Sequence, residues 1–410
     1  MATQGAAESV VLITIDRETV SASLTFADGG GVTAPLATSP FANSSSLTRI
    51  HFSPPLQIVY LVTQSGDEVA LEFPARDAAG QLDGRPVVYL DQNQWSVLNN
   101  AHREPSRVTA GDLAAAQQIA EWARERRIIL PMSAGHYHET TKRFDAGKRY
   151  GLGLTMLQLS RGWQMRDPLD VRRSEMADGY RRRRLGNLAA AARTLDVFTL
   201  LPNVLFGPTR PQRPATKADW TALVDMTFYH QALTSITAMA DTLLDANRIE
   251  PGVGEGWSAH NQAFSEWIDK ETREVEQKKK SIDALLLVDL QQELAEEAAK
   301  ACVSLDDFRG WFLQDAVADM QEMPSIGVYR EVLHERHLNK GTRWRSNDLT
   351  DMIYLSCAAG YADFVICERH MCAMLRQGAR RTKASARTFR RLRDAAPEIE
   401  DALAAVPASR

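Results

Sequence analysis

The sequence is poor in cysteine and in long apolar runs, and these shortages narrow the class of protein. Its four cysteines form neither a C-x-x-C pair nor a zinc-ligand pattern, which favours a reduced, cytoplasmic setting. The longest aliphatic run, Ala284–Val288, is far too short to span a bilayer. The N-terminus lacks a basic stretch followed by an apolar core, so we expect neither a signal peptide nor a membrane partner.

What the chain does have is length and enough apolar residues for sizeable cores. At 410 residues and 44% hydrophobic content it predicts two or three domains. The net charge of −4 says nothing about partners, so the distribution of charge matters more. Residues 1–80 predict a β-rich module, because four strand-like runs alternate with turn clusters such as Ser65-Gly66-Asp67.

From residue 81 the pattern changes to alternating strands and helices. Val87–Leu90 predicts a buried strand, and Ile128–Leu130 a second one. Thr109 and Asp112 predict a capping box, and Ser133 a cap for the helix that follows. This alternation favours a parallel sheet over residues 81–151, and it returns over 331–394. Residues 152–330 read as an all-helical insertion, and 395–410 as a C-terminal tail.

Acidic side chains recur where these strands end or these helices begin. Asp91 follows the strand Val87–Leu90, and Glu139 lies on the helix after Ser133. Further along, Asp348 and Asp351 open a helix, and Asp363 and Glu368 bracket the strand Ala362–Cys367. An acid after a strand is often only a helix cap. Carboxylates clustered at one sheet edge repel each other, however, and favour a hard cation such as Mg²⁺ or Mn²⁺.

Three stretches of the chain together resemble the PIN-domain nucleases. They are LDQNQW, PMSAGHYHET and SNDLTDMIYLSCAAGYADFVICERHM, and they lie within Arg85–Lys142 and Arg345–Arg380. The resemblance implies a PIN-like parallel sheet flanked by helices, and a metal-dependent ribonuclease with a two-metal type of mechanism. It also implies Mg²⁺ or Mn²⁺ as the cofactor and RNA, in preference to DNA, as the partner.

The resemblance assigns roles to individual residues. Asp91, Glu139, Asp351 and Glu368 match the catalytic, metal-binding acids, and Asn93 matches a polar neighbour in a D-x-N motif. Asp348 and Asp363 are further candidates for the metal. Two features depart from the family pattern: the long interval between Glu139 and Asp348, and a glutamate rather than an aspartate at 368.

Basic residues next to these acids predict where a nucleic acid binds. No acid interrupts residues 369–393, where Arg369, Arg376, Arg380, Arg381 and Lys383 directly follow Glu368. Such a run suits phosphate contacts. His138 is a further candidate for substrate contact, since the His136-x-His138 spacing does not fit a zinc site on a helix. A second basic run, Arg172 to Arg184, is equally consistent with nucleic-acid contact and with a solvated face.

Two rival functions remain open on the sequence. One is a PIN-like nucleic-acid-binding or scaffolding protein without catalytic activity, and the other is a structure-specific DNA nuclease. The acids are compatible with either nucleic acid as substrate. The β-rich module or the helical insertion could also hold a regulatory partner or a second copy of the chain, as in a toxin or defence system.

Overall fold

The computed structural model describes residues 10–37, 39–41, 46–74, 82–143, 145–185, 195–200, 221–244, 255–382 and 384–405. The chain divides into two compact units. Unit 1 comprises residues 1–83, 120–164 and 198–249. Unit 2 comprises residues 84–119, 165–197 and 250–410. Each unit buries a set of apolar side chains of its own.

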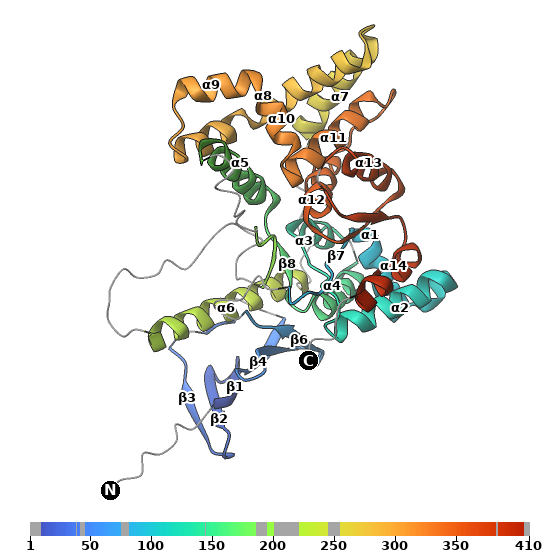
Figure 1. Cartoon of the computed structure of the whole chain (residues 1–410). Helices are drawn as coiled ribbons and strands as arrows, with labels where there is room; N and C mark the ends of the chain where they lie inside the picture. Colours follow the sequence, from blue (N-terminus) through green and yellow to red (C-terminus); the bar gives the residue numbers. More distant parts are fainter. Residues whose placement is uncertain are drawn as a thin grey trace. The chain divides into compact units, whose positions relative to one another are not determined.

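Unit 1 is built on a six-stranded antiparallel sheet, which confirms the predicted β-rich module. Its strands are β1 (Val10–Asp16), β2 (Ser21–Phe26), β3 (Gly31–Pro35), β4 (Leu47–Ser53), β5 (Ile58–Thr63) and β6 (Glu68–Glu72), in the order β3-β2-β1-β4-β5-β6 (Figure 1). Tight turns connect them, and Gly66 adopts a positive φ of 84° between β5 and β6. Burial is concentrated in β4 to β6, where Leu47, Ile50 and Leu61 are fully buried.

Helices cover that buried half of the sheet. Helix α4 (Ala146–Ser160) packs on β6 and α6 (Thr221–Leu244) on β4, whereas α3 (Ala134–Thr141) packs on these two helices. The segment β9 (Phe198–Thr199) is a short strand. The ring of Phe52 on β4 packs 5.6 Å from that of Tyr229 on α6. Helices α4 and α6 approach closely at Gly153, where an added Cβ would lie 2.5 Å from the carbonyl oxygen of Leu243. A larger residue at 153 would therefore push the two helices apart.

Unit 2 contains the parallel sheet. Its strands β7 (Val88–Leu90), β10 (Phe364–Ile366) and β11 (Arg387–Phe389) are ordered β11-β10-β7, and all of β7 and β10 is buried. Helix α1 (Gln92–Arg103) follows β7, α12 (Asp348–Tyr361) precedes β10, and α13 (Arg369–Ala379) follows it. The chain is thus α/β, but the described parallel sheet has only three strands. Ile128–Leu130 is buried without being a strand in its own right.

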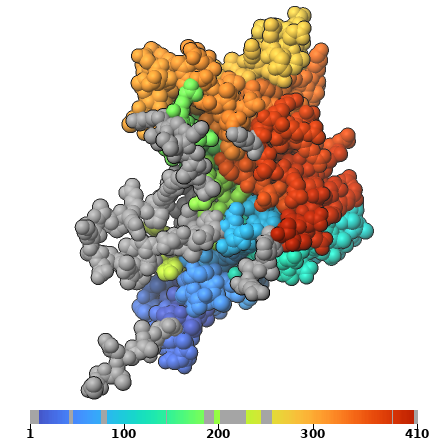
Figure 2. All heavy atoms as spheres, viewed as in Figure 1, coloured from blue at the N-terminus to red at the C-terminus, as the bar shows by residue number. Residues whose placement is uncertain are grey.

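The remaining elements of unit 2 are helical, apart from β8 (Gln164–Met165) at the division between the units. They are η1 (Pro105–Arg107), α2 (Ala110–Arg124, which the division also crosses), α5 (Pro168–Leu185), α7 (Glu255–Lys270), α8 (Val275–Lys300), α9 (Leu305–Gln314), α10 (Ala316–Gln321), α11 (Pro324–Leu338) and α14 (Leu392–Ala405). The elements from α8 onward form a continuous orange and red face in Figure 2. The segment predicted as one helical insertion, 152–330, contributes helices to both units. Among the described helices, none has the length and apolar character needed to cross a membrane.

Helix α11 is the centre of unit 2, because α5, α8, α12 and α13 all pack against it. Its N-terminus is fixed by the buried carboxylate of Glu175 on α5. That carboxylate accepts hydrogen bonds from the backbone N–H groups of Ser325 (2.7 Å) and Ile326 (3.1 Å) and from the hydroxyl of Tyr361 (2.6 Å). One side chain therefore joins α5, α11 and α12.

Burial raises the pKa of Glu175 to about 7, although the hydrogen bonds from Tyr361, Ser325 and Ile326 oppose the shift. Between pH 4.5 and 7 the folded protein keeps a proton that the unfolded chain releases. The free energy of unfolding should therefore fall over this range, by up to about 3 kcal/mol from this residue, and level off above it. Glu175→Gln should remove that part of the pH dependence, because glutamine does not ionise.

Urea unfolding of both proteins in EDTA at several pH values would measure the difference. Asp178→Asn is the matched control on the same helix, since Asp178 forms a partly exposed ion pair with Arg181. An identical pH dependence in wild type and Glu175→Gln would contradict the prediction.

Candidate active site at the ends of the parallel strands

Asp91 lies at the point where β7 ends and α1 begins. Its side chain caps α1, because Oδ1 accepts a hydrogen bond from the backbone N–H of Gln94 at 2.9 Å. Its own N–H donates to the carbonyl oxygen of Ile366 on β10 at 3.0 Å. Asp91 is therefore both a helix cap and part of the carboxyl edge of the parallel sheet.

Glu368 occupies the matching position after β10. Its backbone N–H donates to Oδ2 of Asp91 at 2.8 Å, and its own carboxylate accepts a hydrogen bond from the side-chain amide of Asn93. Glu368 and Asn93 are exposed, whereas Asp91 is partly buried. The structure therefore brings together Asp91, Asn93 and Glu368, which the sequence had grouped as site residues.

Asp351 lies in the first turn of α12, close enough for its negative charge to act on the carboxyl group of Asp91. The pKa of Asp91 is raised to about 7, first by burial and then by the negative charges of Glu368 and Asp351, against the hydrogen bonds from the N–H groups of Gln94 and Glu368. The pKa of the buried Cys367 thiol is raised by a hydrogen bond with Cys372, by burial and by the charges of Asp91 and Asp351. The charges of Glu368 and Asp351 thus both act on Asp91, and those of Asp91 and Asp351 act on Cys367.

This environment suits a hard cation in its chemistry. The donors are carboxylate oxygens, and a positive ion would offset both the burial and the neighbouring negative charges that raise the pKa of Asp91. Within the described ranges, however, no three His, Cys, Asp or Glu side chains lie close enough together to hold a metal as they stand. A bound ion would therefore require Asp351 and Glu368 to turn toward Asp91.

Two of the predicted metal ligands lie elsewhere. Asp363 precedes β10, and its Oδ2 accepts a hydrogen bond from the N–H of Val87 at 2.7 Å. It is therefore at the opposite end of the strands from Asp91, because β7 and β10 are parallel. Asp348 forms an ion pair with Arg336 and also accepts a hydrogen bond from the N–H of Arg345 at 2.6 Å. Asp351 is the better third ligand, because its charge, and not that of Asp348, acts on Asp91.

Glu139 and His138 lie on α3 in unit 1, so their place beside Asp91 stays a prediction. Helix α3 begins with the predicted cap at Ser133, in a capping box that His136 completes through a 3.0 Å hydrogen bond from the N–H of Ser133. The Nδ1 atom of His136 is thus already bound to a backbone N–H group. The pKa of the half-buried His138 is lowered by burial and by the charge of Lys142.

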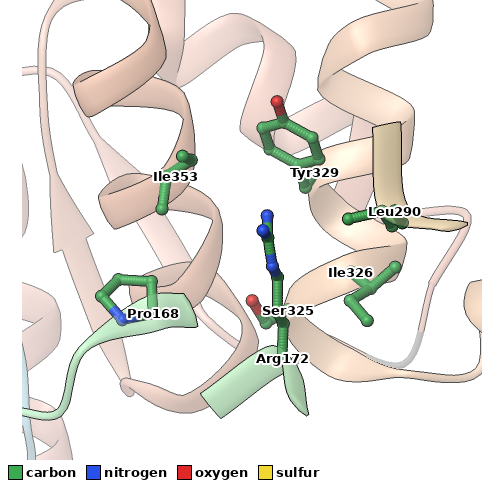
Figure 3. A pocket seen from close by; sticks show the side chains of 7 residues that line it. All are labelled: Pro168, Arg172, Leu290, Ser325, Ile326, Tyr329 and Ile353. Atoms are coloured by element: carbon green, nitrogen blue, oxygen red, sulfur yellow. The ribbon is translucent and has the colours of Figure 1, made fainter. Parts of the chain in front are cut away.

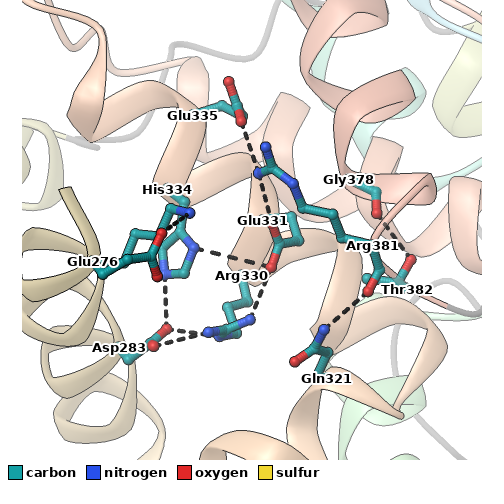
Figure 4. Close-up of polar contacts among 11 residues, drawn as sticks. Glu276, Asp283, Gln321, Arg330, Glu331, His334, Glu335, Gly378, Arg381 and Thr382 are labelled. Atoms are coloured by element: carbon teal, nitrogen blue, oxygen red, sulfur yellow. Dashed lines mark hydrogen bonds and ion pairs between the residues drawn. The ribbon is translucent and has the colours of Figure 1, made fainter.

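The basic run after Glu368 is less free than its sequence suggested. Arg376 donates to the carbonyl oxygen of Thr388 at 3.0 and 2.6 Å. Arg381 points at Glu331 (3.0 Å) and Glu335 (2.9 Å) on α11 (Figure 4). These two arginines fix α13 to β11 and α11. Arg369 and Arg380 are exposed, and Lys383 lies outside the described residues.

The second basic run, on α5, is largely paired with acids of unit 2. Arg172 points into a small cavity lined by Pro168, Leu290 and Tyr329 (Figure 3). Its guanidinium also forms an ion pair with Glu293. Further pairs join Arg173 to Glu296 and Glu297, Arg181 to Asp178, and Arg183 to Asp315 and Asp319. For these arginines the packing role outweighs nucleic-acid contact.

Sequence reasoning missed the segment Asn339–Asn347, which leads into α12 and which we call the Trp344 loop. Trp344 is buried, whereas Arg343 and Arg345 on either side of it are exposed. The alternation of charge and tryptophan in Arg343-Trp344-Arg345 was the available signal. The longer basic run after Glu368 was the stronger indication of phosphate contact, so this segment was not predicted.

Comparison of the chain with known proteins identifies no family for it. No family model, no curated protein and no solved structure matches it. The function must therefore be argued from the residues themselves.

Proposed function

We propose that unit 2 carries a metal-dependent nuclease site that hydrolyses phosphodiester bonds, with RNA as the favoured substrate. The observation that carries this proposal is the group of three carboxyl side chains, Asp91, Asp351 and Glu368, around the carboxyl ends of β7 and β10. Ligands of open α/β sheets bind at this edge. The preference for RNA, and a PIN-like core with Glu139 as a fourth acid, rest on the resemblance of the three sequence stretches to PIN-domain nucleases.

Each residue of the group has a distinct task in the proposed reaction. Asp91 is held rigidly by two backbone N–H groups and provides the central carboxylate. Asn93 donates to Glu368 and keeps that longer side chain at this edge of the sheet, from which it would turn toward a bound ion. The N-termini of α1 and α13 meet beside these residues, and their dipoles favour the negative charge of a phosphate.

Asp91, Asp351 and Glu368 would hold the Mg²⁺ or Mn²⁺ ion. When bound, such an ion supplies an activated water and stabilises the charge on the phosphoryl oxygens. The protein's own contribution is to gather the carboxylates at one edge of the sheet and to keep Glu368 there through Asn93. No protein side chain needs to form a covalent bond with the substrate.

A second function, nucleic-acid binding without cleavage, is favoured by one feature of the same site. Both oxygens of Asp91 already accept backbone hydrogen bonds, so the residue could serve only to join α1 to the start of α13. A structure-specific DNA nuclease would use the same acids. The proposed function and these two alternatives differ in whether the protein cleaves a nucleic acid, and in whether that nucleic acid is RNA or DNA.

Incubation of the full-length protein with labelled single-stranded RNA, structured RNA, single-stranded DNA and flap DNA would test the proposal. We expect RNA cleavage with Mn²⁺ or Mg²⁺ and none with EDTA. Cleavage of DNA alone would keep the chemistry and overturn the substrate. Binding of RNA without cleavage under all metal conditions would favour the second function.

A further inference from the structure

The Trp344 loop is held in place by unusually many contacts for a connecting segment. From α7, Gln262 accepts a hydrogen bond from the N–H of Trp344 at 3.0 Å, and Asp269 accepts one from the N–H of Gly341 at 3.2 Å. The indole N–H of Trp344 donates to the hydroxyl of Ser265 at 2.7 Å. The loop is therefore fixed on α7 by its backbone and by its central side chain.

Aromatic and cationic contacts complete the anchor. The ring of Trp344 lies 4.7 Å from that of His337 and 5.2 Å from that of Trp257. The guanidinium of Arg336 lies 4.7 Å above the Trp344 ring and also donates to the carbonyl oxygen of Arg343 at 3.1 Å. Because Trp344 fills this interior site, Arg343 and Arg345 are directed to the surface.

Arg343 and Arg345 are also chemically free. Among the residues that the structure describes, neither has an acidic partner within 4.0 Å, in contrast to Arg336, Arg381 and the paired arginines of α5. Asp348, the nearest acid in sequence, is neutralised by Arg336. A guanidinium that is rigidly presented and unpaired is suited to grip a phosphate through two parallel hydrogen bonds.

The loop also lies next to the candidate active site in the fold. The N–H of Arg345 donates to Asp348 in the first turn of α12, the same turn that carries Asp351. The ion pair of Arg336 and Asp348 is also near the first turn of α13, because both charges act on His370 in that turn. Helix α13 begins with the exposed Arg369. Positive side chains are needed at such a rim, since a carboxylate cluster repels a polyanionic substrate.

We propose that Arg343 and Arg345, presented by the anchored Trp344 loop, bind the phosphates of single-stranded RNA that leads into the site of Asp91, Asp351 and Glu368. This inference rests on the proposed nuclease function and names a substrate-binding element of that site. The sequence predicted phosphate contacts along the whole of α13, whereas this proposal places them where α12 and α13 begin. Arg369 extends the same edge.

Fluorescence anisotropy with a labelled 12-nucleotide oligouridylate, in EDTA, would test the proposal without requiring cleavage. The double variant Arg343→Ala/Arg345→Ala should bind about tenfold more weakly than wild type at moderate salt. Loss of two phosphate contacts should also reduce the slope of log K against log salt by about 1.4. Arg343→Lys/Arg345→Lys should recover most of the affinity, because it keeps the charge.

Lys280→Ala/Arg309→Ala is the matched control, since it removes the same charge from exposed positions on α8 and α9. Equal binding by wild type and the Arg343→Ala/Arg345→Ala variant would overturn the proposal. So would an equal loss in the control, or an equal loss for a labelled oligo-aspartate peptide, which would indicate a general anion surface. Weaker RNA binding in the arginine variant of a protein that never cleaves RNA would support this proposal while refuting the nuclease function.

Discussion

Asp91→Asn should abolish metal-dependent RNA cleavage, with a fall of about 1000-fold or more in kcat/KM. A loss of this size corresponds to about 4 kcal/mol of transition-state stabilisation, which is within the contribution of a metal ion to phosphoryl transfer. The substitution keeps the size of the side chain, and one amide oxygen still caps α1. What it removes is the negative charge at the centre of the carboxylate group, together with the oxygen that accepts the hydrogen bond from the N–H of Glu368.

Asp363→Asn provides the matched control for this experiment. It changes an aspartate that borders the same pair of strands, but at their amino ends, where Oδ2 accepts a hydrogen bond from Val87. An asparagine oxygen can accept that bond, so this variant should cleave RNA like wild type. Equal activity in Asp91→Asn and wild type would remove Asp91 from the catalytic site and leave it as a helix cap.

The Asp91 variant should also respond differently to metal. Mn²⁺ should raise the melting temperature of the wild-type protein, because an ion that binds only the folded state stabilises it. It should have little effect on Asp91→Asn. This readout separates loss of metal binding from loss of a chemical step, since it does not require substrate.

Arg330→Met should cause a large loss of stability, because it breaks a buried charge network in unit 2. Arg330 on α11 binds both oxygens of Asp283 on α8, at 2.6 and 2.8 Å, and an oxygen of Glu331 at 2.8 Å (Figure 4). All three side chains are about nine-tenths buried or more. Removing the cation takes away the main buried partner of Asp283, which keeps only His334, and breaking a buried ion pair in this way typically costs about 3–5 kcal/mol.

The pKa of Asp283 shows how strongly this network favours its charged form. Burial alone would raise the pKa, but hydrogen bonds from His334 and Arg330 outweigh burial and lower it. Because the pKa is lowered on folding, the stabilisation is present at neutral pH and is lost as the pH falls through the acidic range. Urea unfolding at neutral pH and in the acidic range should therefore show a smaller difference between wild type and Arg330→Met in acid.

Two further variants make this prediction specific. Arg330→Met/Asp283→Leu should recover part of the lost stability, because it removes the buried charge together with its partner. Arg381→Ala should cost much less, since Arg381 is partly exposed where it pairs with Glu331 and Glu335. If Arg330→Met unfolds like Arg381→Ala, the buried network contributes little.

Much of the local structure followed from the sequence because its causes are local. The strand at Val88–Leu90, one residue shorter than predicted, and the cap at Ser133 depend on residues within a few positions of each other, and both are present. The N–H of Asp112 donates to the Thr109 hydroxyl at 3.4 Å, which is half of the predicted capping box. The β-rich module could also be predicted from local sequence, since turn residues such as Gly66 separate its strands. The grouping of Asp91 with Glu368 also held, because parallel strands place their carboxyl ends together.

The tertiary structure alone decided which charged residues are free to act. Arg376 and Arg381 looked like phosphate ligands in a run without acids, but Arg376 contacts β11 and Arg381 contacts α11. Asp348 and Asp351 are one turn apart, but Asp348 pairs with Arg336, whereas the charge of Asp351 acts on Asp91. Arg343 and Arg345 gained their importance from the burial of Trp344 against α7. Pairings between distant charges depend on the packing of whole helices, and no local pattern in the sequence encodes them.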